Sequence, residues 1–228
     1  MAGEDLLRTA GTVRKRLGRW LEERGIGWLK VPKSASDVAR LGAGGGRVPV
    51  ARAVIRSARR PRQDDPMLVV HGTKKFLDRV GSSTSAPDDV STTQLGSWYA
   101  TVLFWKSRVA LFVSEETLLP MLLPLAPAAS VLDRFGGGLE TLLYAHGVAA
   151  PFIAAELSEV GQCRLAKTNN RSVLGSMNEF AYLADAFRQS TEAFDLLALS
   201  LRLAETPCSP LYKSHVTPHD ELLARAAR

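Results

Sequence analysis

The sequence is poor in the residues that build disulfide frameworks and metal centres. It holds two cysteines, Cys163 and Cys208, and four histidines in 228 residues. Two widely spaced cysteines are typical of buried thiols in a reducing compartment. No apolar run reaches the roughly 18 residues of a membrane-spanning helix. The first residues, MAGEDLL, place acids before any base, unlike a secretory signal. We therefore expect a cytoplasmic protein that makes no use of a membrane.

Motifs that hold nucleotides or support hydrolysis are also missing. There is no G-x-x-x-x-G-K-[ST] loop, no G-x-G-x-x-G after a strand, no G-x-S-x-G and no H-E-x-x-H. The neighbouring acids Glu115 and Glu116 follow a strand, where adjacent side chains point to opposite faces and cannot form a catalytic pair. The sequence thus predicts no cofactor, and it leaves open whether the protein is an enzyme.

Positive charge is confined to the first part of the chain. The net charge is +6, but residues 1–66 carry 15 Lys and Arg against 7 Asp and Glu, a net of +8. Residues 67–228 carry 14 against 16, a net of −2. The high pI therefore describes the first segment alone and says nothing about the rest. We divide the chain into a basic extension, 1–66, and a single domain, 67–228.

The extension has little from which to build a core. It contains no Phe, Tyr, Cys or His, and only the stretch Leu6 to Leu21 has the apolar spacing of a short amphipathic helix. The Gly-, Arg- and Pro-rich remainder is typical of a disordered linker. Three interpretations stay open: an arm that binds nucleic acid, a helix that docks on a partner or a membrane surface, or the product of a start codon assigned upstream of the true one.

From Met67 onward, short strand-like runs are followed by helical patterns. The predicted strands are 68–71, 98–105, 109–114 and 162–167. The predicted helices are 73–80, 117–123, 128–146, 151–160, 194–204 and a short one after Pro218. The strongest helix carries one apolar stripe, formed by Val173, Met177, Phe180, Ala184 and Phe187. This pattern favours an α+β domain in which helices pack on a small three- or four-stranded sheet and the C-terminal half is rich in helix.

Four short motifs in this domain resemble a bacterial family known only as a domain of unknown function. They are Thr-Lys-Lys-Phe-Leu at 73–77, Trp-Tyr-Ala at 98–100, Phe-Val-x-Glu at 112–115 and Asn-Arg-Ser-Val-x-Gly-Ser-Met-Asn at 170–178. The resemblance covers about residues 67–212. It brings no catalytic residues, and the fusion of some members to a plasmid-type module implies an association with mobile elements rather than a mechanism.

The junction between the last strand and the strongest helix is the best candidate for a binding site. Free N–H groups and the helix dipole at such a position favour an anion. The candidate anion-binding residues are Lys167, Asn169, Asn170, Arg171, Ser172, Asn178 and Lys74. A competing interpretation is structural: Asn170 or Ser172 caps the helix, and Asn178 binds backbone within the fold.

Among the histidines, only His71 is a candidate acid or base, because it ends a strand just before a polar turn. His215 and His219 have the spacing of a helical metal pair, but Pro218 between them argues against a continuous helix, so no metal is expected. Three functions remain in competition. The first is binding of a polyanion or nucleic-acid backbone at 167–172. The second is a small hydrolase or toxin-like nuclease that acts on a phosphate ester. The third is a protein-interaction subunit that docks a partner through the apolar segment 118–125.

Overall fold

The computed structural model describes residues 66–82, 89–189 and 195–228. The basic extension, with its expected amphipathic helix, lies outside these residues. The strands are β1 (Met67–Gly72), β2 (Trp98–Leu103), β3 (Val109–Ser114), β4 (Pro120–Pro124) and β5 (Gln162–Lys167). The helices are α3 (Lys74–Val80), η1 (Ala128–Ser130), α4 (Phe135–His146), α5 (Ala150–Glu159), α6 (Arg171–Gln189), α7 (Leu196–Ala204), η2 (Ser209–Leu211) and α8 (Pro218–Ala226).

The five strands form one mixed sheet in the order β4-β3-β2-β1-β5. β1 lies between β2 and β5 and runs parallel to both, with His71 opposite Tyr99 of β2 on one side and opposite Ala166 of β5 on the other. The pairs β2–β3 and β3–β4 are antiparallel hairpin partners. β5 therefore joins the sheet beside a strand that lies about a hundred residues earlier in the chain.

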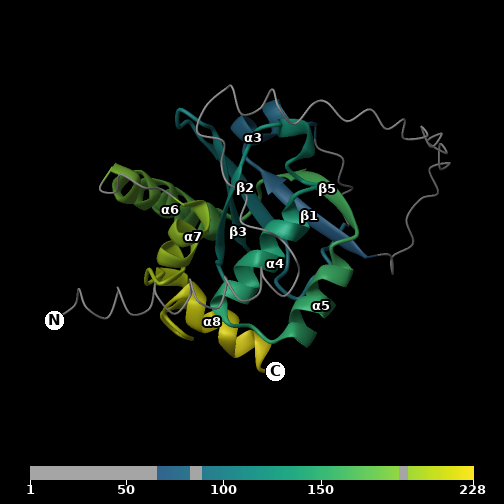
Figure 1. Ribbon diagram of the computed structural model, residues 1–228, viewed down its shortest axis with the longest axis vertical. Helices are drawn as coiled ribbons and strands as arrows, with labels where there is room; N and C mark the ends of the chain where they lie inside the picture. Colours follow the sequence, from purple (N-terminus) through teal and green to yellow (C-terminus); the bar gives the residue numbers. More distant parts are fainter. Residues whose placement is uncertain (1–65, 83–88, 190–194) are drawn as a thin grey trace, which may run out of the picture. The chain divides into compact units, whose positions relative to one another are not determined.

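Each face of the sheet is covered by a separate apolar cluster. Alternate residues of β2 divide between them: Trp98 and Ala100 belong to a cluster with α3, α4 and α5, whereas Tyr99 and Leu103 belong to a cluster with α6. Figure 1 shows α6 on the other side of the sheet from α4 and α5. The first face is rich in aromatic contacts, in which the Phe135 ring packs edge-on against Trp98 and Phe112.

Several predictions from the sequence are confirmed. β3 and β5 have the predicted bounds, and α6 buries four members of the apolar stripe, while Phe187 is partly buried. The α+β class is also confirmed. Thr73 stands at the N-cap position of α3, although its hydroxyl donates to Thr101 rather than to the helix. The predicted helix 194–204 is α7, which begins at Leu196, and residue 194 lies outside the described part of the chain.

Three predictions are wrong. The segment 117–123, expected as a helix, contributes the fifth strand, so the three- or four-stranded estimate is too low. Pro120 and Pro124 stand at the two ends of β4, an edge strand where a missing N–H group is tolerated. The predicted helix 128–146 is in fact the short η1 followed by α4, with Arg134 directly before the first turn of α4.

The apolar segment 118–125 is largely buried by the chain itself. Leu118, Leu119, Met121, Leu122 and Leu125 are all at most 3% exposed. The N–H of Leu122 donates to the Ser200 hydroxyl of α7 at 2.9 Å, so α7 covers part of the free edge of β4. This segment offers little apolar surface to a partner. None of the described helices is both long and apolar enough to cross a bilayer.

Candidate functional site at the carboxyl ends of β1 and β5

The parallel strands β1 and β5 end side by side and then lead to opposite faces of the sheet. Gly72 pairs with Lys167 at the last position of both strands. The chain leaves β1 into α3, which packs with the first cluster, and leaves β5 into α6, which packs with the second. α3 lies so close to β1 that a Cβ atom on Gly72 would stand 2.8–2.9 Å from side-chain atoms of Leu77 and Phe76. The two connections therefore diverge from one point, at the carboxyl ends of β1 and β5.

His71 lies at this point, and its orientation is fixed by the backbone of β5. The ring Nδ1 is 2.9 Å from the carbonyl oxygen of Lys167. A carbonyl can only accept, so Nδ1 carries the proton, and the neutral ring has its lone pair on Nε2. The ring stacks on Tyr99, with a centroid distance of 4.7 Å and an interplanar angle of 18°. This arrangement holds one half-buried imidazole in a defined tautomer.

Tyr99 connects the sheet to the loop before α6. Its hydroxyl donates to the side-chain oxygen of Asn169 and lies 3.4 Å from a carboxylate oxygen of Glu115. Burial raises the pKa of the Tyr99 phenol well above its usual value, and the nearby charge of Glu115 acts in the same direction. Tyr99 is therefore a hydrogen-bond donor at neutral pH and cannot act as a base.

Asn170 caps α6. Its side-chain oxygen accepts from the backbone N–H groups of Ser172 at 3.0 Å and Val173 at 3.4 Å. Its amide nitrogen donates to Glu115 at 3.1 Å, so one side chain joins the helix start to the end of β3. Of the two residues expected as caps, Asn170 takes the role. Two of the N–H groups at the helix start thus have an internal acceptor and are not free for a ligand.

The predicted basic residues surround the junction on different sides. Gly72, the register partner of Lys167, faces α3, so alternation along the strands places the Lys167 side chain on the α3 face. Arg171 begins α6 on the other face. Lys74 is the first residue of α3 and lies two positions beyond Gly72. All three side chains are exposed, as are those of Ser172 and Asn178.

Asn178 lies two helical turns from Arg171, about 10 Å along the axis of α6. It is therefore outside the immediate junction. The structure brings His71, Asn169, Asn170 and the backbone of Lys167 into one cluster, in which His71 bonds the Lys167 carbonyl and stacks on Tyr99, the partner of Asn169. Lys74, Lys167 and Arg171 are exposed charges around it.

Tyr99 and Glu115 belong to this group but were missed as site residues. Both fall in motifs that the sequence made conspicuous, Trp-Tyr-Ala and Phe-Val-x-Glu. However, they are 70 and 55 positions away from the Asn residues that they contact. Only knowledge of the strand order could have placed them there.

The other histidines lie elsewhere and make pairs of their own. His146, at the end of α4, and His219, in the first turn of α8, approach through their Nδ1 atoms at 2.8 Å. His146 is 8% exposed, and burial, with a smaller effect of His219, lowers its pKa from 6.5 to about 3. His215 bonds Glu221 at 2.9 Å. Within the described ranges, no three His, Cys, Asp or Glu side chains gather as a metal site would require.

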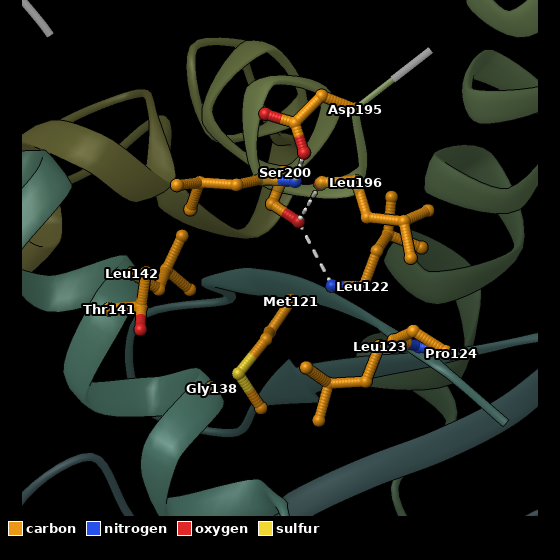
Figure 2. A pocket seen from close by; sticks show the side chains of 11 residues that line it. Met121, Leu122, Leu123, Pro124, Gly138, Thr141, Leu142, Asp195, Leu196 and Ser200 are labelled. Carbon is orange, nitrogen blue, oxygen red and sulfur yellow. Dashed lines mark hydrogen bonds between the residues drawn. The ribbon is translucent and has the colours of Figure 1, made fainter. Parts of the chain in front are cut away.

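A cavity of about 460 Å³ lies between β4, α4 and α7. Figure 2 shows its lining, in which Met121, Leu123 and Leu142 supply apolar surface. The polar groups in it are already engaged: the Ser200 hydroxyl donates to Leu196 and accepts from Leu122, and Asp195 caps α7. The cavity can accommodate apolar atoms, but its bonded hydroxyl and carboxylate offer no ready acid or base.

Taken together, these features define a mixed-sheet α+β domain with one polar cluster at the end of two adjacent parallel strands. The chain belongs to the family described as domain of unknown function DUF6933, whose model matches residues 69–221. The match covers the described domain and leaves the basic extension outside it. No curated protein and no solved structure is significantly similar to the chain.

Proposed function

We propose that this domain is a binding module for a polyanion, which it holds through phosphate groups at the carboxyl ends of β1 and β5. The divergence of the two connections carries the proposal. In open sheets, ligands bind outside the carboxyl ends of neighbouring parallel strands whose connections go to opposite faces. β1 and β5 are such a pair, since they lead to α3 and α6 respectively.

The charges at the junction support an anionic ligand. Lys74, Lys167 and Arg171 are exposed there, although the domain as a whole has a net charge of −2. The His71 ring adds a nitrogen, Nε2, that can accept from a protonated ligand oxygen or, when protonated, donate to an anionic one. A phosphate chain or a nucleic-acid backbone provides the repeated negative charge that these groups can contact.

The test is titration of the full-length protein with inorganic pyrophosphate, in which isothermal calorimetry measures the binding. Pyrophosphate is small enough to report on the junction alone. We expect Arg171→Ala and Lys167→Ala each to weaken binding about tenfold, which corresponds to about 1.4 kcal/mol for one charge-assisted contact. The melting temperature should hardly change, because both side chains are exposed.

Arg188→Ala is the matched control. It removes one arginine from the same helix, but from its last turn, about 25 Å from Arg171. It should leave pyrophosphate binding unchanged. Equal binding by Arg171→Ala, Lys167→Ala and the parent protein would refute the proposal.

A second candidate, hydrolysis of a phosphate ester, is favoured by one observation. The Lys167 carbonyl fixes Nδ1 of His71 as the donor and leaves Nε2 as the basic nitrogen, which is the arrangement of a general base. Release of nitrophenol from a nitrophenyl phosphodiester, with the phosphomonoester as the other product, would support it if His71→Gln abolished the reaction. Binding of pyrophosphate without hydrolysis of the phosphodiester would contradict the enzyme and support the binding module.

A further inference from the structure

The turn between β2 and β3 carries an exposed aromatic ring between two cations. Phe104 is 55% exposed, directly after the end of β2. The Lys75 ammonium lies 5.7 Å from the centroid of its ring, and the Arg79 guanidinium carbon lies 5.2 Å from it. An exposed phenylalanine makes no contribution to the core, so its contacts with two basic side chains give it the character of a surface site.

Further basic residues stand in the same turn. Lys106 and Arg108 are both exposed and flank Ser107 at its tip. Leu103 pairs with Val109, so Phe104 and Arg108 occupy the next positions of the hairpin, opposite each other. We call Lys75, Arg79, Phe104, Lys106 and Arg108 the hairpin patch.

The concentration of charge in the hairpin patch is local. Between residues 67 and 133 there are five Lys and Arg, and all of them lie in α3 or in this turn. Asp78 is the one acid that α3 contributes. Residues 67–228 together carry a net charge of −2, so the patch is a positive region on a domain that is otherwise slightly negative.

The hairpin patch stands at the same end of the sheet as the junction. β1, β2 and β5 are parallel, so their carboxyl ends point in one direction. Ala100 is level with Gly72, which places Phe104 four residues farther along, roughly 13 Å beyond the ends of β1 and β5. Figure 1 shows α3 beside the end of β2, consistent with the contacts of Phe104.

From these observations we infer that the hairpin patch binds single-stranded nucleic acid, with a base stacked on Phe104 and the backbone phosphates on the surrounding lysines and arginines. Single-strand binding surfaces combine aromatic rings for the bases with cations that follow the backbone. A duplex keeps its bases stacked inside, so it can use the cations but not the ring. The inference depends on residues outside the junction and can therefore fail or succeed without the proposed function.

The test is fluorescence anisotropy of a labelled 20-nucleotide single-stranded DNA with the full-length protein over a range of salt concentrations. We expect Phe104→Ala to weaken binding about 5- to 100-fold, as loss of one stacked base does. Phe104→Trp should preserve or strengthen it. Lys75→Ala and Arg79→Ala should each reduce the slope of log K against log salt by about 0.7.

Tyr182→Ala is the matched control, because Tyr182 is an aromatic residue on α6 with 75% of its surface exposed. It should bind the oligonucleotide like the parent protein. If Phe104→Ala also binds like the parent, base stacking is refuted, and a salt slope lowered only by the lysine and arginine variants would identify a purely electrostatic surface. Weakening by Arg171→Ala but not by Phe104→Ala would assign the binding to the junction instead.

Photo-crosslinking provides a second measurement that separates the domain from the basic extension. A single-stranded oligonucleotide containing 4-thiothymidine should crosslink to the peptide that includes Phe104, and mass spectrometry would identify it. Crosslinks confined to residues 1–66 would overturn the inference.

Discussion

His146 should make the protein lose stability in mild acid. The side chain is buried at the end of α4, and only its Nδ1 has a hydrogen-bond partner among the described residues, namely His219. Burial holds the pKa of His146 near 3 in the folded state, whereas an exposed histidine in the unfolded chain has a pKa near 6.5. Below pH 6.5 the unfolded chain therefore binds a proton that the folded chain does not, and the free energy of unfolding falls.

The size of the effect follows from the two pKa values. Each pKa unit corresponds to about 1.4 kcal/mol. At pH 5.5 the loss is about 1.4 kcal/mol, and at pH 4.5 it is about 3 kcal/mol, a large fraction of the stability of an ordinary domain. Carboxylates begin to titrate in the lower part of this window, and burial raises the pKa of Glu156. Hydrogen bonds from His215 and Ser214 outweigh burial at Glu221 and lower its pKa. The effect of His146 is therefore taken from the difference between a His146 variant and the parent protein, which share the same carboxylates.

Urea unfolding at several pH values measures this loss. Trp98 is fully buried in the first cluster and reports the transition by fluorescence. His146→Gln keeps a group that can bond His219 but cannot titrate. The variant should therefore lose about 3 kcal/mol less than the parent protein between pH 6.5 and 4.5, whatever its stability at neutral pH.

His219→Gln is the informative control. It removes the smaller influence on the pKa of His146 but leaves the burial, so most of the acid sensitivity should persist. Parallel stability curves for His146→Gln and the parent would refute the reasoning. If His219→Gln alone lost the acid sensitivity, His219 and not His146 would be the group that causes it.

Further predictions concern the helix starts and the glycines. Asn170→Ala should cost about 0.5–2 kcal/mol in urea unfolding, because it removes the cap of α6 and the bond to Glu115, whereas Asn170→Asp should retain the cap. Gly137→Ala should raise stability by about 0.5–1 kcal/mol, since a Cβ there meets only open space. Gly72→Ala should cost about 1–3 kcal/mol, because its Cβ would overlap the buried Phe76 ring. Equal melting temperatures for the two glycine variants would contradict the packing described at β1.

Local patterns predicted many of the elements but not their arrangement. The apolar stripe from Val173 to Ala184 identified α6, and the run of β-branched and aromatic residues at 109–113 indicated β3, because both depend on neighbours within a few residues. The segment that forms β4 was expected to be a helix, because periodicity does not separate strand from helix in so short an apolar run. Its assignment depends on pairing with β3, which a local pattern does not contain.

In the candidate site, too, local contacts could be predicted from the sequence and long-range contacts could not. The predicted junction residues Asn169 and Asn170 do lie at a strand-to-helix connection, as the local sequence indicated. Their contact with Tyr99, and the bond between His71 and the Lys167 carbonyl, join segments 70 and 96 positions apart. Such contacts follow from the place of β5 beside β1, which the sequence alone did not indicate.

The position of β1 between β2 and β5 also bears on how the domain forms during translation. β1 is made first among the described strands, yet one of its two partners, β5, is synthesised about a hundred residues later. Until then, Leu68, Val69 and Val70 stand on an open strand edge, the kind of surface that recruits other chains. Closing so long a loop is slow. The nascent domain is therefore most open to mispairing in the interval after β1 has been made and before β5 leaves the ribosome.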